Sequence, residues 1–350
     1  MSDLRFAIFG TGFWSRFQLA GWRELQGAEC VALYNRTKSK AEALGREFGV
    51  PAVYDDPEEL LDKERLDFID IITDVDTHAR FVRMAAERGL AAICQKPMAP
   101  DLETALEMQK VCEEASVPLY IHENFRWQTP LRTLKHVLEQ GRIGDVFRAR
   151  LSFNSSFPVF ENQPFLMEID NFMLVDVGSH ILDSARFLFG EAESLYCHTR
   201  RVNPEIKGED VATVMLKMTS GATVVCEMSY ATRSEFERFP QTFAFIEGER
   251  GSIALTKDFW IRVTTEEGAF ATRHAPPRYS WADPEYDVVQ SSIVPCNADI
   301  LQALQGKGAA ETTGSDNVKT MELVYGSYES AAANSRYDVL ADALTTTFGR

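Results

Sequence analysis

Asp176 and His180 are four residues apart in a segment, roughly residues 172–189, whose pattern predicts a helix ending before Gly190. Side chains four apart on a helix share a face. A carboxylate beside an imidazole orients the ring and raises its pKa, as a general acid or base requires. A histidine with a purely structural role is the alternative. A metal site is disfavoured, because no further His or Cys stands nearby at the spacing of a ligand.

Lys96 is a second candidate for chemistry. It follows the strand-like run Ala91–Gln95 and precedes Pro97. Ligands of open α/β sheets bind outside the carboxyl ends of the strands, so a lysine in this position is expected at a cofactor cleft. An ordinary surface lysine on a turn is the alternative.

A glycine-rich turn, Gly10-Thr11-Gly12-Phe13-Trp14-Ser15, directly follows the first strand-like run. The first glycine permits a tight turn, and the second lets a pyrophosphate approach backbone N–H groups at a helix N-terminus. Ser15 occupies the third position, where a small residue suffices for close packing of helix on strand. At the front of a strand–helix–strand unit, this turn predicts a dinucleotide site.

Two further turns carry polar residues at the same predicted sheet edge. Asn35 and Arg36 follow the second strand-like run, where an acidic residue would accept the ribose hydroxyls and mark NAD. Asn35 can still bond the ribose, and Arg36 can stack on adenine or meet a 2′-phosphate, so this turn leaves NAD and NADP open. After the fourth strand-like run come three more candidates for cofactor contact, Thr73, Asp74 and His78.

These residues must be positioned by the elements of the first 125 residues, in which strand-like and helix-like segments alternate. Several strand candidates are nearly continuous apolar runs, as expected for strands covered on both faces. The candidates are Arg5–Phe9, Glu29–Tyr34, Ala52–Tyr54, Phe68–Thr73, Ala91–Gln95 and Leu119–Glu123. This alternation predicts an α/β domain over residues 1–125 with a doubly wound parallel sheet.

The pattern changes after about residue 145 to long, alternating strands. Thr219–Gly221 and Gly248–Gly251 are typical of hairpin turns between them. Helices are expected near residues 129–141, 288–304 and 318–335. Residues 126–350 are therefore predicted to form an α+β domain with a mostly antiparallel sheet.

The composition excludes several classes of partner. The 350 residues include 36 basic and 52 acidic side chains, for a net charge of −16, which disfavours nucleic acid and anionic membranes as partners. No apolar run approaches the roughly 18 residues of a membrane span. The six cysteines are scattered, and the N-terminus leads straight into a strand-like run without a charged leader. These features indicate a cytoplasmic protein.

Gly10-Thr11-Gly12, Gln95-Lys96-Pro97 and Asp176-Val177-Gly178-Ser179-His180, in this order, resemble the glucose–fructose oxidoreductase / inositol dehydrogenase / rhizopine catabolism family of sugar dehydrogenases. The resemblance extends over essentially the whole chain and includes Ile143-Gly144 and the hairpin at Gly248–Gly251. It implies a Rossmann domain followed by an α/β domain with a large open sheet that carries subunit contacts. A homodimer or homotetramer and NAD as cofactor are expected, with NADP not excluded.

The resemblance also implies roles for individual residues. Lys96 matches the lysine of the family's Glu-Lys-Pro, and Asp176 and His180 match its Asp and His. His180, oriented by Asp176, would take the proton of a sugar hydroxyl while hydride leaves to the nicotinamide, and Lys96 would stabilise the charge on the same oxygen. The family's Glu is Gln95 in this chain, which removes a negative charge beside Lys96. Gln95 and Asn124 complete the predicted cofactor contacts.

Two segments, Asn124–Gln128 and Phe157–Phe165, resemble family members that oxidise a branched pentose to its lactone with NAD. Within and near these segments, Asn154 and Gln163 offer amides for sugar hydroxyls, and Trp127 offers a ring for a sugar face. Packing in the core is the alternative for the aromatic residues. Two other functions stay open: an NAD-dependent glycoside hydrolase on the same fold, and a non-catalytic dinucleotide-binding regulator.

Overall fold

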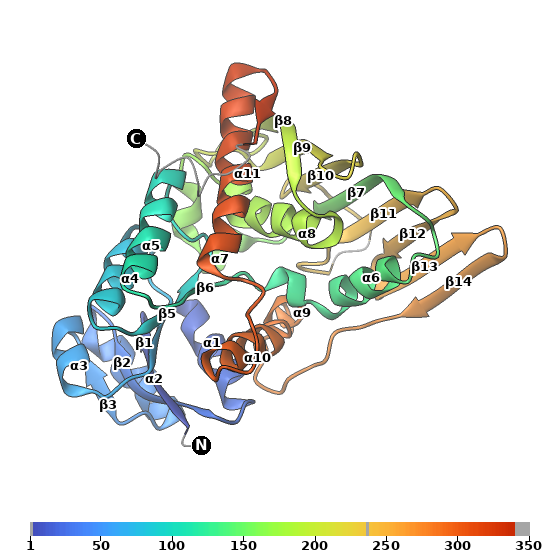
Figure 1. Ribbon diagram of the computed structural model, residues 1–350. Helices are drawn as coiled ribbons and strands as arrows, with labels where there is room; N and C mark the ends of the chain where they lie inside the picture. The colour runs from blue at the N-terminus through green and yellow to red at the C-terminus, as the bar shows by residue number, and fades with distance from the viewer. Residues whose placement is uncertain (1–2, 236–237, 340–350) are drawn as a thin grey trace. The chain divides into compact units, whose positions relative to one another are not determined.

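The computed structural model describes residues 3–235 and 238–339, and the chain divides into two compact units. Unit 1 comprises the residues up to Glu123 together with Ile293–Met321 (Figure 1, blue to cyan and orange-red). Unit 2 comprises Asn124–Ser292 and the residues from Glu322 on. The sequence analysis placed a single boundary between residues 125 and 126, and the return of 293–321 to unit 1 was not predicted.

Unit 1 contains a six-stranded parallel sheet in the order β3-β2-β1-β4-β5-β6. Its elements are β1 (Leu4–Phe9), α1 (Phe13–Arg23), β2 (Ala28–Tyr34), α2 (Lys38–Phe48), β3 (Ala52–Tyr54), α3 (Pro57–Lys63), β4 (Phe68–Ile71), η1 (Val75–Thr77), α4 (His78–Glu87), β5 (Ala91–Gln95), α5 (Leu102–Glu114), β6 (Leu119–His122) and α10 (Ile293–Leu304). This strand order reverses between β1 and β4, as in dinucleotide-binding domains. The predicted doubly wound parallel sheet is confirmed.

Alternate residues of β1 bury the two faces of this sheet against different helices. Phe6 stacks on Phe68 of β4 with ring centroids 4.8 Å apart, and both rings contact Trp22 of α1. Phe9 points to the other face, where it meets Phe81 of α4 edge-on at 5.3 Å. Successive strand residues point to opposite faces, so one apolar run supplies both cores.

The helix predicted over residues 288–304 is interrupted in the structure, giving α9 (Asp287–Gln290) and α10. The hydroxyls of Ser291 and Ser292 donate to the carbonyls of Val288 and Val289, competing with the main-chain bonds of a continuous helix. The pattern of apolar residues conceals this break. Helix α9 belongs to unit 2 and α10 to unit 1.

Unit 2 contains a nine-stranded sheet in the order β14-β13-β12-β11-β7-β10-β9-β8-β15. Its other elements and strands are η2 (Phe125–Trp127), α6 (Thr129–Glu139), β7 (Val146–Asn154), α7 (Val159–Asn162), η3 (Pro164–Met167), η4 (Leu174–Gly178), α8 (Ser179–Phe189), β8 (Ala192–Arg200), β9 (Val211–Met218), β10 (Thr223–Ser229), β11 (Phe243–Gly248), β12 (Gly251–Thr256), η5 (Lys257–Phe259), β13 (Trp260–Thr265), β14 (Gly268–Arg273), α9 and β15 (Tyr337–Asp338). The division between units falls within α11 (Gly314–Ala333). β7 and β10 are parallel, and every other neighbouring pair is antiparallel. The predicted mostly antiparallel sheet and both predicted hairpins are confirmed.

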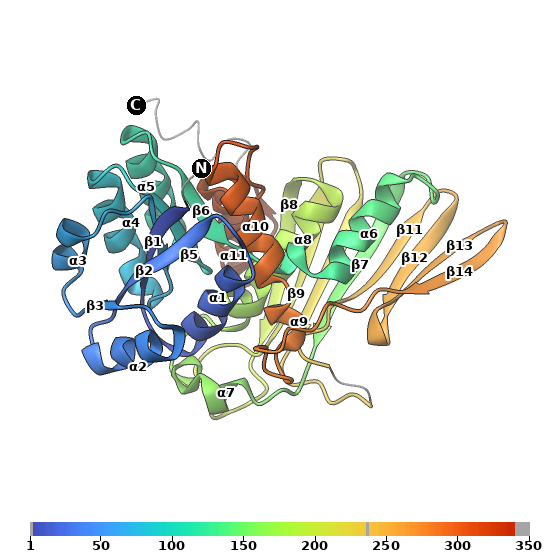
Figure 2. The same cartoon turned by 90° about the horizontal axis from the view of Figure 1, so that it is seen from below.

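One face of this sheet packs against α8, which contacts β7 and β10. Helix α6 packs beside α8, and Figure 2 shows both helices next to β7. Residues that point to this face, such as Val214 and Val224, are fully buried. Their neighbours point to the opposite face, which is open, and Met215 and Phe245 are 48% and 41% exposed there. No helix within the described residues is long and apolar enough to cross a membrane.

Candidate active site

The glycine-rich turn of unit 1 has the geometry of a phosphate cradle. Gly10 has φ +98°, and a Cβ there would lie 2.5 Å from the carbonyl oxygen of Ile72, so only glycine fits. At Gly12, by contrast, a Cβ would meet no atom within 4 Å, and α1 begins at the next residue without a side-chain cap. The buried Oγ1 of Thr11 has no hydrogen-bond partner among the described residues. The open space at Gly12 in front of a helix N-terminus and the unpaired hydroxyl of Thr11 fit a dinucleotide pyrophosphate.

Asn35 supports this turn from the end of β2. Its Oδ1 accepts the backbone N–H of Thr11 at 3.1 Å, and its Nδ2 donates to the carbonyl of Thr37 at 3.0 Å. The side chain of Arg36 is exposed. Lys38, the next basic residue, lies 3.5 Å from Asp55 in an ion pair. The turn therefore offers one exposed guanidinium, while the nearest lysine faces a carboxylate.

His78 joins the loop after β4 to the segment after Lys96. Its ring is 1% exposed, with Nδ1 3.2 Å from the carbonyl oxygens of Pro97 and Met98 and Nε2 3.1 Å from that of Thr73. Burial lowers the pKa of His78, although the three carbonyls act in the opposite direction. Since both ring nitrogens face protein carbonyls, His78 holds the two loops together.

A row of buried polar side chains lies against the α1 face of the sheet, and the sequence analysis did not identify it. Gln18 of α1 donates to Asp70 of β4 and to Asn297 of α10, both at 3.2 Å. The amide of Gln95 donates to Gln18 at 3.5 Å, and His122 bonds Asn297 at 2.9 Å. The residue before Lys96 is thus linked to the helix of the glycine-rich turn. A charged residue inside the apolar run Phe68–Ile72 was the available signal.

In unit 2, Asp176 lies in η4, a single π-helical turn, and His180 in the first turn of α8. The sequence analysis predicted one regular helix here. At the start of this turn, the carboxylate of Glu209 accepts the backbone N–H groups of Phe172 and Leu174 at 3.2 and 3.1 Å, so it caps the segment. Such widened turns are frequent at functional sites.

Tyr230, at the end of β10, is a site residue that the sequence analysis missed. Its hydroxyl donates to Oδ2 of Asp176 at 3.3 Å, and its ring stacks on Phe172 with centroids 5.5 Å apart. Burial and the neighbouring carboxylate raise the pKa of Tyr230 well above its ordinary value, so the hydroxyl stays protonated and donates. Nothing in the sequence pairs residues this far apart in the chain.

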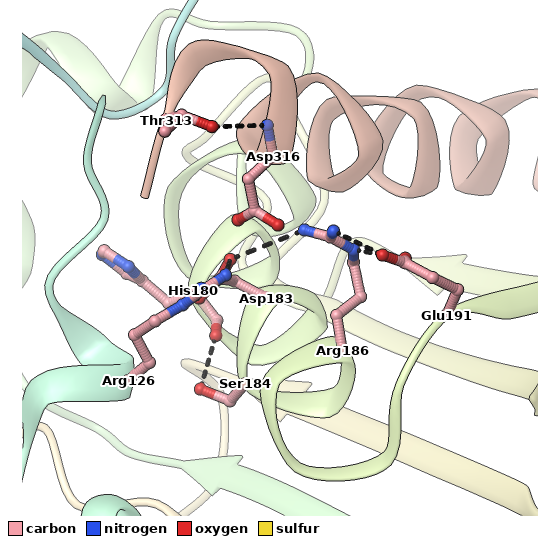
Figure 3. A network of polar contacts seen from close by, with 8 residues as sticks. All are labelled: Arg126, His180, Asp183, Ser184, Arg186, Glu191, Thr313 and Asp316. Carbon is pink, nitrogen blue, oxygen red and sulfur yellow. Dashed lines mark hydrogen bonds and ion pairs between the residues drawn. The ribbon is translucent and has the colours of Figure 1, made fainter. Parts of the chain in front are cut away.

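His180 is 5% exposed and stacks on Phe125 of η2. The next residue of η2, Arg126, forms two hydrogen bonds with Asp183 of α8, as Figure 3 shows. Asp183 also lies 3.9 Å from Arg186. Helix α8 is thus joined to η2 on the side that carries His180.

The remaining predicted contacts of unit 2 are more dispersed. Asn124 is buried, and its amide donates to the carbonyl of Val289 at 3.4 Å. Trp127 lies under the guanidinium of Arg132, and its buried indole N–H has no hydrogen-bond partner among the described residues. Asn154 ends β7 opposite the residue before Tyr230. Gln163 lies between α7 and η3, outside the strands.

The aromatic residues near Gln163 differ among themselves. Phe157 stacks on Phe239 with centroids 4.1 Å apart, and Phe160 contacts Phe172. Phe165, in contrast, is 60% exposed. Phe157 and Phe160 therefore pack against other aromatic rings, as in the alternative that the sequence analysis considered.

The structure therefore brings the predicted residues together in two sets. Gly10, Thr11, Asn35, Thr73 and the loop of Lys96 meet at the carboxyl edge of the parallel sheet in unit 1. The other set, in unit 2, consists of Asp176 and His180 with their supporting residues. Within the described part of the chain, no three His, Cys, Asp or Glu side chains gather as a metal site.

Comparison with known families agrees with this geometry. Residues 4–123 match the model described as "Oxidoreductase family, NAD-binding Rossmann fold", and residues 131–254 match the "GFO/IDH/MocA C-terminal domain". The chain belongs to the GFO/IDH/MocA oxidoreductase family, and unit 1 carries its NAD-binding Rossmann domain. The family predicted from the three motifs is confirmed.

Individual relatives are similar over almost the whole chain. The chain is 41% identical over 339 residues to D-apiose dehydrogenase of Rhizobium rhizogenes, with 97% of this chain and 98% of that protein covered. It is 42% identical over 325 residues to D-apiose dehydrogenase of Paraburkholderia graminis, covering 93% and 87%. A crystal structure of an oxidoreductase from Agrobacterium radiobacter in complex with NAD+, L-tartaric acid and magnesium matches with TM-score 0.95 and 40% identity, covering 97% and 99%.

Proposed function

We propose that this oxidoreductase oxidises D-apiose to its lactone, with NAD as the hydride acceptor. The observation that carries the proposal is the similarity to two D-apiose dehydrogenases, which extends over 97% and 93% of this chain. The presence of Lys96, Asp176 and His180, which match the family's motifs, supports a working enzyme rather than a regulator that only binds dinucleotide.

The residues divide the reaction between them. NAD, when bound, accepts a hydride at C4 of its nicotinamide. His180 removes the proton of the hydroxyl whose carbon is oxidised, so that the carbon–oxygen double bond of the lactone forms as hydride leaves. Asp176, held by Tyr230, stabilises the imidazolium that results. The ammonium of Lys96 donates to the reacting oxygen and offsets its developing negative charge.

Purified protein tested against a panel of aldoses with NAD or NADP decides the substrate. We expect D-apiose to give the highest kcat/KM and to yield its lactone with one NADH per sugar. A higher kcat/KM for an unbranched aldose would overturn the assignment of the sugar. Release of phenol from an aryl glycoside would instead identify a glycoside hydrolase.

We also propose that the open face of the unit 2 sheet joins copies of the chain into a homodimer or homotetramer. Met215, Val225, Arg150 and Phe245 lie directly opposite one another on β9, β10, β7 and β11, so the face carries a continuous partly apolar row. Light scattering should show an oligomer that Phe245→Glu weakens. A wild-type monomer at micromolar concentration would refute this assembly.

The cytoplasm is the compartment we propose. Five of the six cysteines, all except Cys30, are buried as free thiols, and none forms a disulfide in the structure. Free thiols are typical of proteins in a reducing compartment.

A further inference from the structure

The ring of His180 is covered on one face by an aromatic ring. The centroids of Phe125 and His180 are 3.7 Å apart, and the two planes differ by 5°. Both residues are buried, at 3% and 5% exposure. An imidazole in such a stack cannot turn about its Cβ–Cγ bond without driving its edge into the neighbouring ring.

The stack is held in register by the residues next to it. Arg126 follows Phe125, and Asp183 follows His180 by one helical turn. The guanidinium donates from Nε to Oδ2 at 2.8 Å and from a terminal nitrogen to Oδ1 at 2.5 Å, as Figure 3 shows. Because the side chains of this pair are 6% and 0% exposed, its two parallel bonds are shielded from water and fix both distance and direction. Helix α8 cannot slide or rotate past η2 while this pair is intact.

We propose that Phe125 is a positioning residue, which fixes the plane of the His180 imidazole through the stack while the Arg126–Asp183 pair fixes the register of the two elements. The inference rests on the proposed function, in which a ring nitrogen of His180 takes the hydroxyl proton. The lone pair of that nitrogen lies in the ring plane, so the ring must be held at one angle for proton transfer to be efficient.

Replacing Phe125 by residues with and without a ring tests the stack. We expect Phe125→Leu to lower kcat roughly tenfold to a hundredfold, since misplaced catalytic groups lose rates of this order. Phe125→Tyr should retain most of kcat, and KM for NAD should change little in both. Phe68→Leu, an aromatic deletion in the core of unit 1, controls for lost stability. Equal kcat values for the Leu and Tyr variants would overturn the proposal.

A double-mutant cycle and a direct measurement of the ring complete the test. If Phe125 acts through His180, Phe125→Leu should lower the residual rate of His180→Ala little further, whereas independent effects would multiply and contradict the proposal. NMR of the His180 ring protons should show an upfield ring-current shift that Phe125→Tyr keeps and Phe125→Leu loses. Full activity in His180→Ala would refute the proposed function. The ring-current shift of His180 in the wild type would still show whether Phe125 stacks on its ring, so the two failures can be told apart.

Discussion

Asp70 in unit 1 and Asp183 in unit 2 are both completely buried, but different groups surround the two carboxyls. Asp70 in unit 1 accepts hydrogen bonds from the neutral N–H groups of Trp22 at 2.8 Å and Gln18 at 3.2 Å. Asp183 in unit 2 is bonded twice by the guanidinium of Arg126. Burial raises the pKa of Asp70 to about 6, because neutral donors do not offset the loss of water around a carboxylate.

The two surroundings suit the different tasks of the two units. Unit 1 presents a glycine-rich turn at the start of a helix to its ligand. Unit 2 holds His180, for which we propose a role in proton transfer, and a paired charge with two parallel bonds gives the direction that this role needs. Breaking the support should therefore have different consequences in the two units.

The largest expected effect comes from the two side chains that we propose take part in the reaction. His180→Ala and Lys96→Ala should each lower kcat by ~10²-fold or more, since general acid–base and electrostatic contributions are of that size. Binding of NAD, measured by calorimetry, should survive in both variants. Near-normal turnover in either one would remove that residue from the mechanism.

Breaking the buried Arg126–Asp183 pair should lower the free energy of unfolding. Asp183→Asn leaves the buried guanidinium of Arg126 without its counter-charge, so the free energy of unfolding should fall by about 3–5 kcal/mol. Asp258 offers a matched control, because Arg273 bonds it in the same two-bond arrangement with both side chains more than 40% exposed. There Asp258→Asn should cost only ~0–1 kcal/mol. Similar midpoints of denaturation for the two variants would contradict the comparison.

Asp70, which neutral groups support, should instead make the free energy of unfolding depend on pH. The pKa of Asp70 is about 6 in the folded chain against an ordinary 3.8, so between these values the folded form holds a proton that the unfolded form has lost. Stability from this group is therefore fully present below pH 3.8 and is lost as the pH rises through about 6. The unfolding free energy of the wild type minus that of Asp70→Asn should fall by up to about 3 kcal/mol between about pH 3 and pH 7. A constant difference would show that Asp70 stays ionised.

The smallest effect is expected at the cofactor turn. Asn35→Asp keeps an oxygen for the N–H of Thr11 and adds a ribose acceptor and a charge that repels a 2′-phosphate. We expect the wild type to prefer NAD, because the single exposed Arg36 contributes only ~0–1 kcal/mol to binding of a phosphate, and Asn35→Asp should sharpen this preference. Values of kcat/KM with both cofactors measure this. A wild-type ratio tenfold or more in favour of NADP would reverse the expectation.

Local patterns predicted the parts of this molecule that local chemistry determines. The glycine-rich turn and the apolar runs predicted the parallel sheet and its ligand-binding edge, and the alternating strands predicted the second sheet. Contacts between residues far apart in the chain could not be predicted from the sequence. Tyr230 meets Asp176, and Glu209 caps the turn before His180, only because the sheet brings them there. Asp70 was visible as a charge in an apolar run, but its partners on α1 were not.

The return of α10 to unit 1 has a consequence for the order in which the chain acquires structure during synthesis. Helix α10 packs so closely on α1 that a Cβ at Gly21 would lie 2.5 Å from Ile293, and Asn297 supplies the acceptor that Gln18 and His122 share. A ribosome delivers these residues only after the whole of 124–292. Until then the nascent domain lacks the helix that packs on α1 and β6. The apolar and amide groups that α10 covers there stay open to water and to chaperones. A fragment that ends at residue 123 should therefore aggregate rather than fold, although it contains every strand of its sheet.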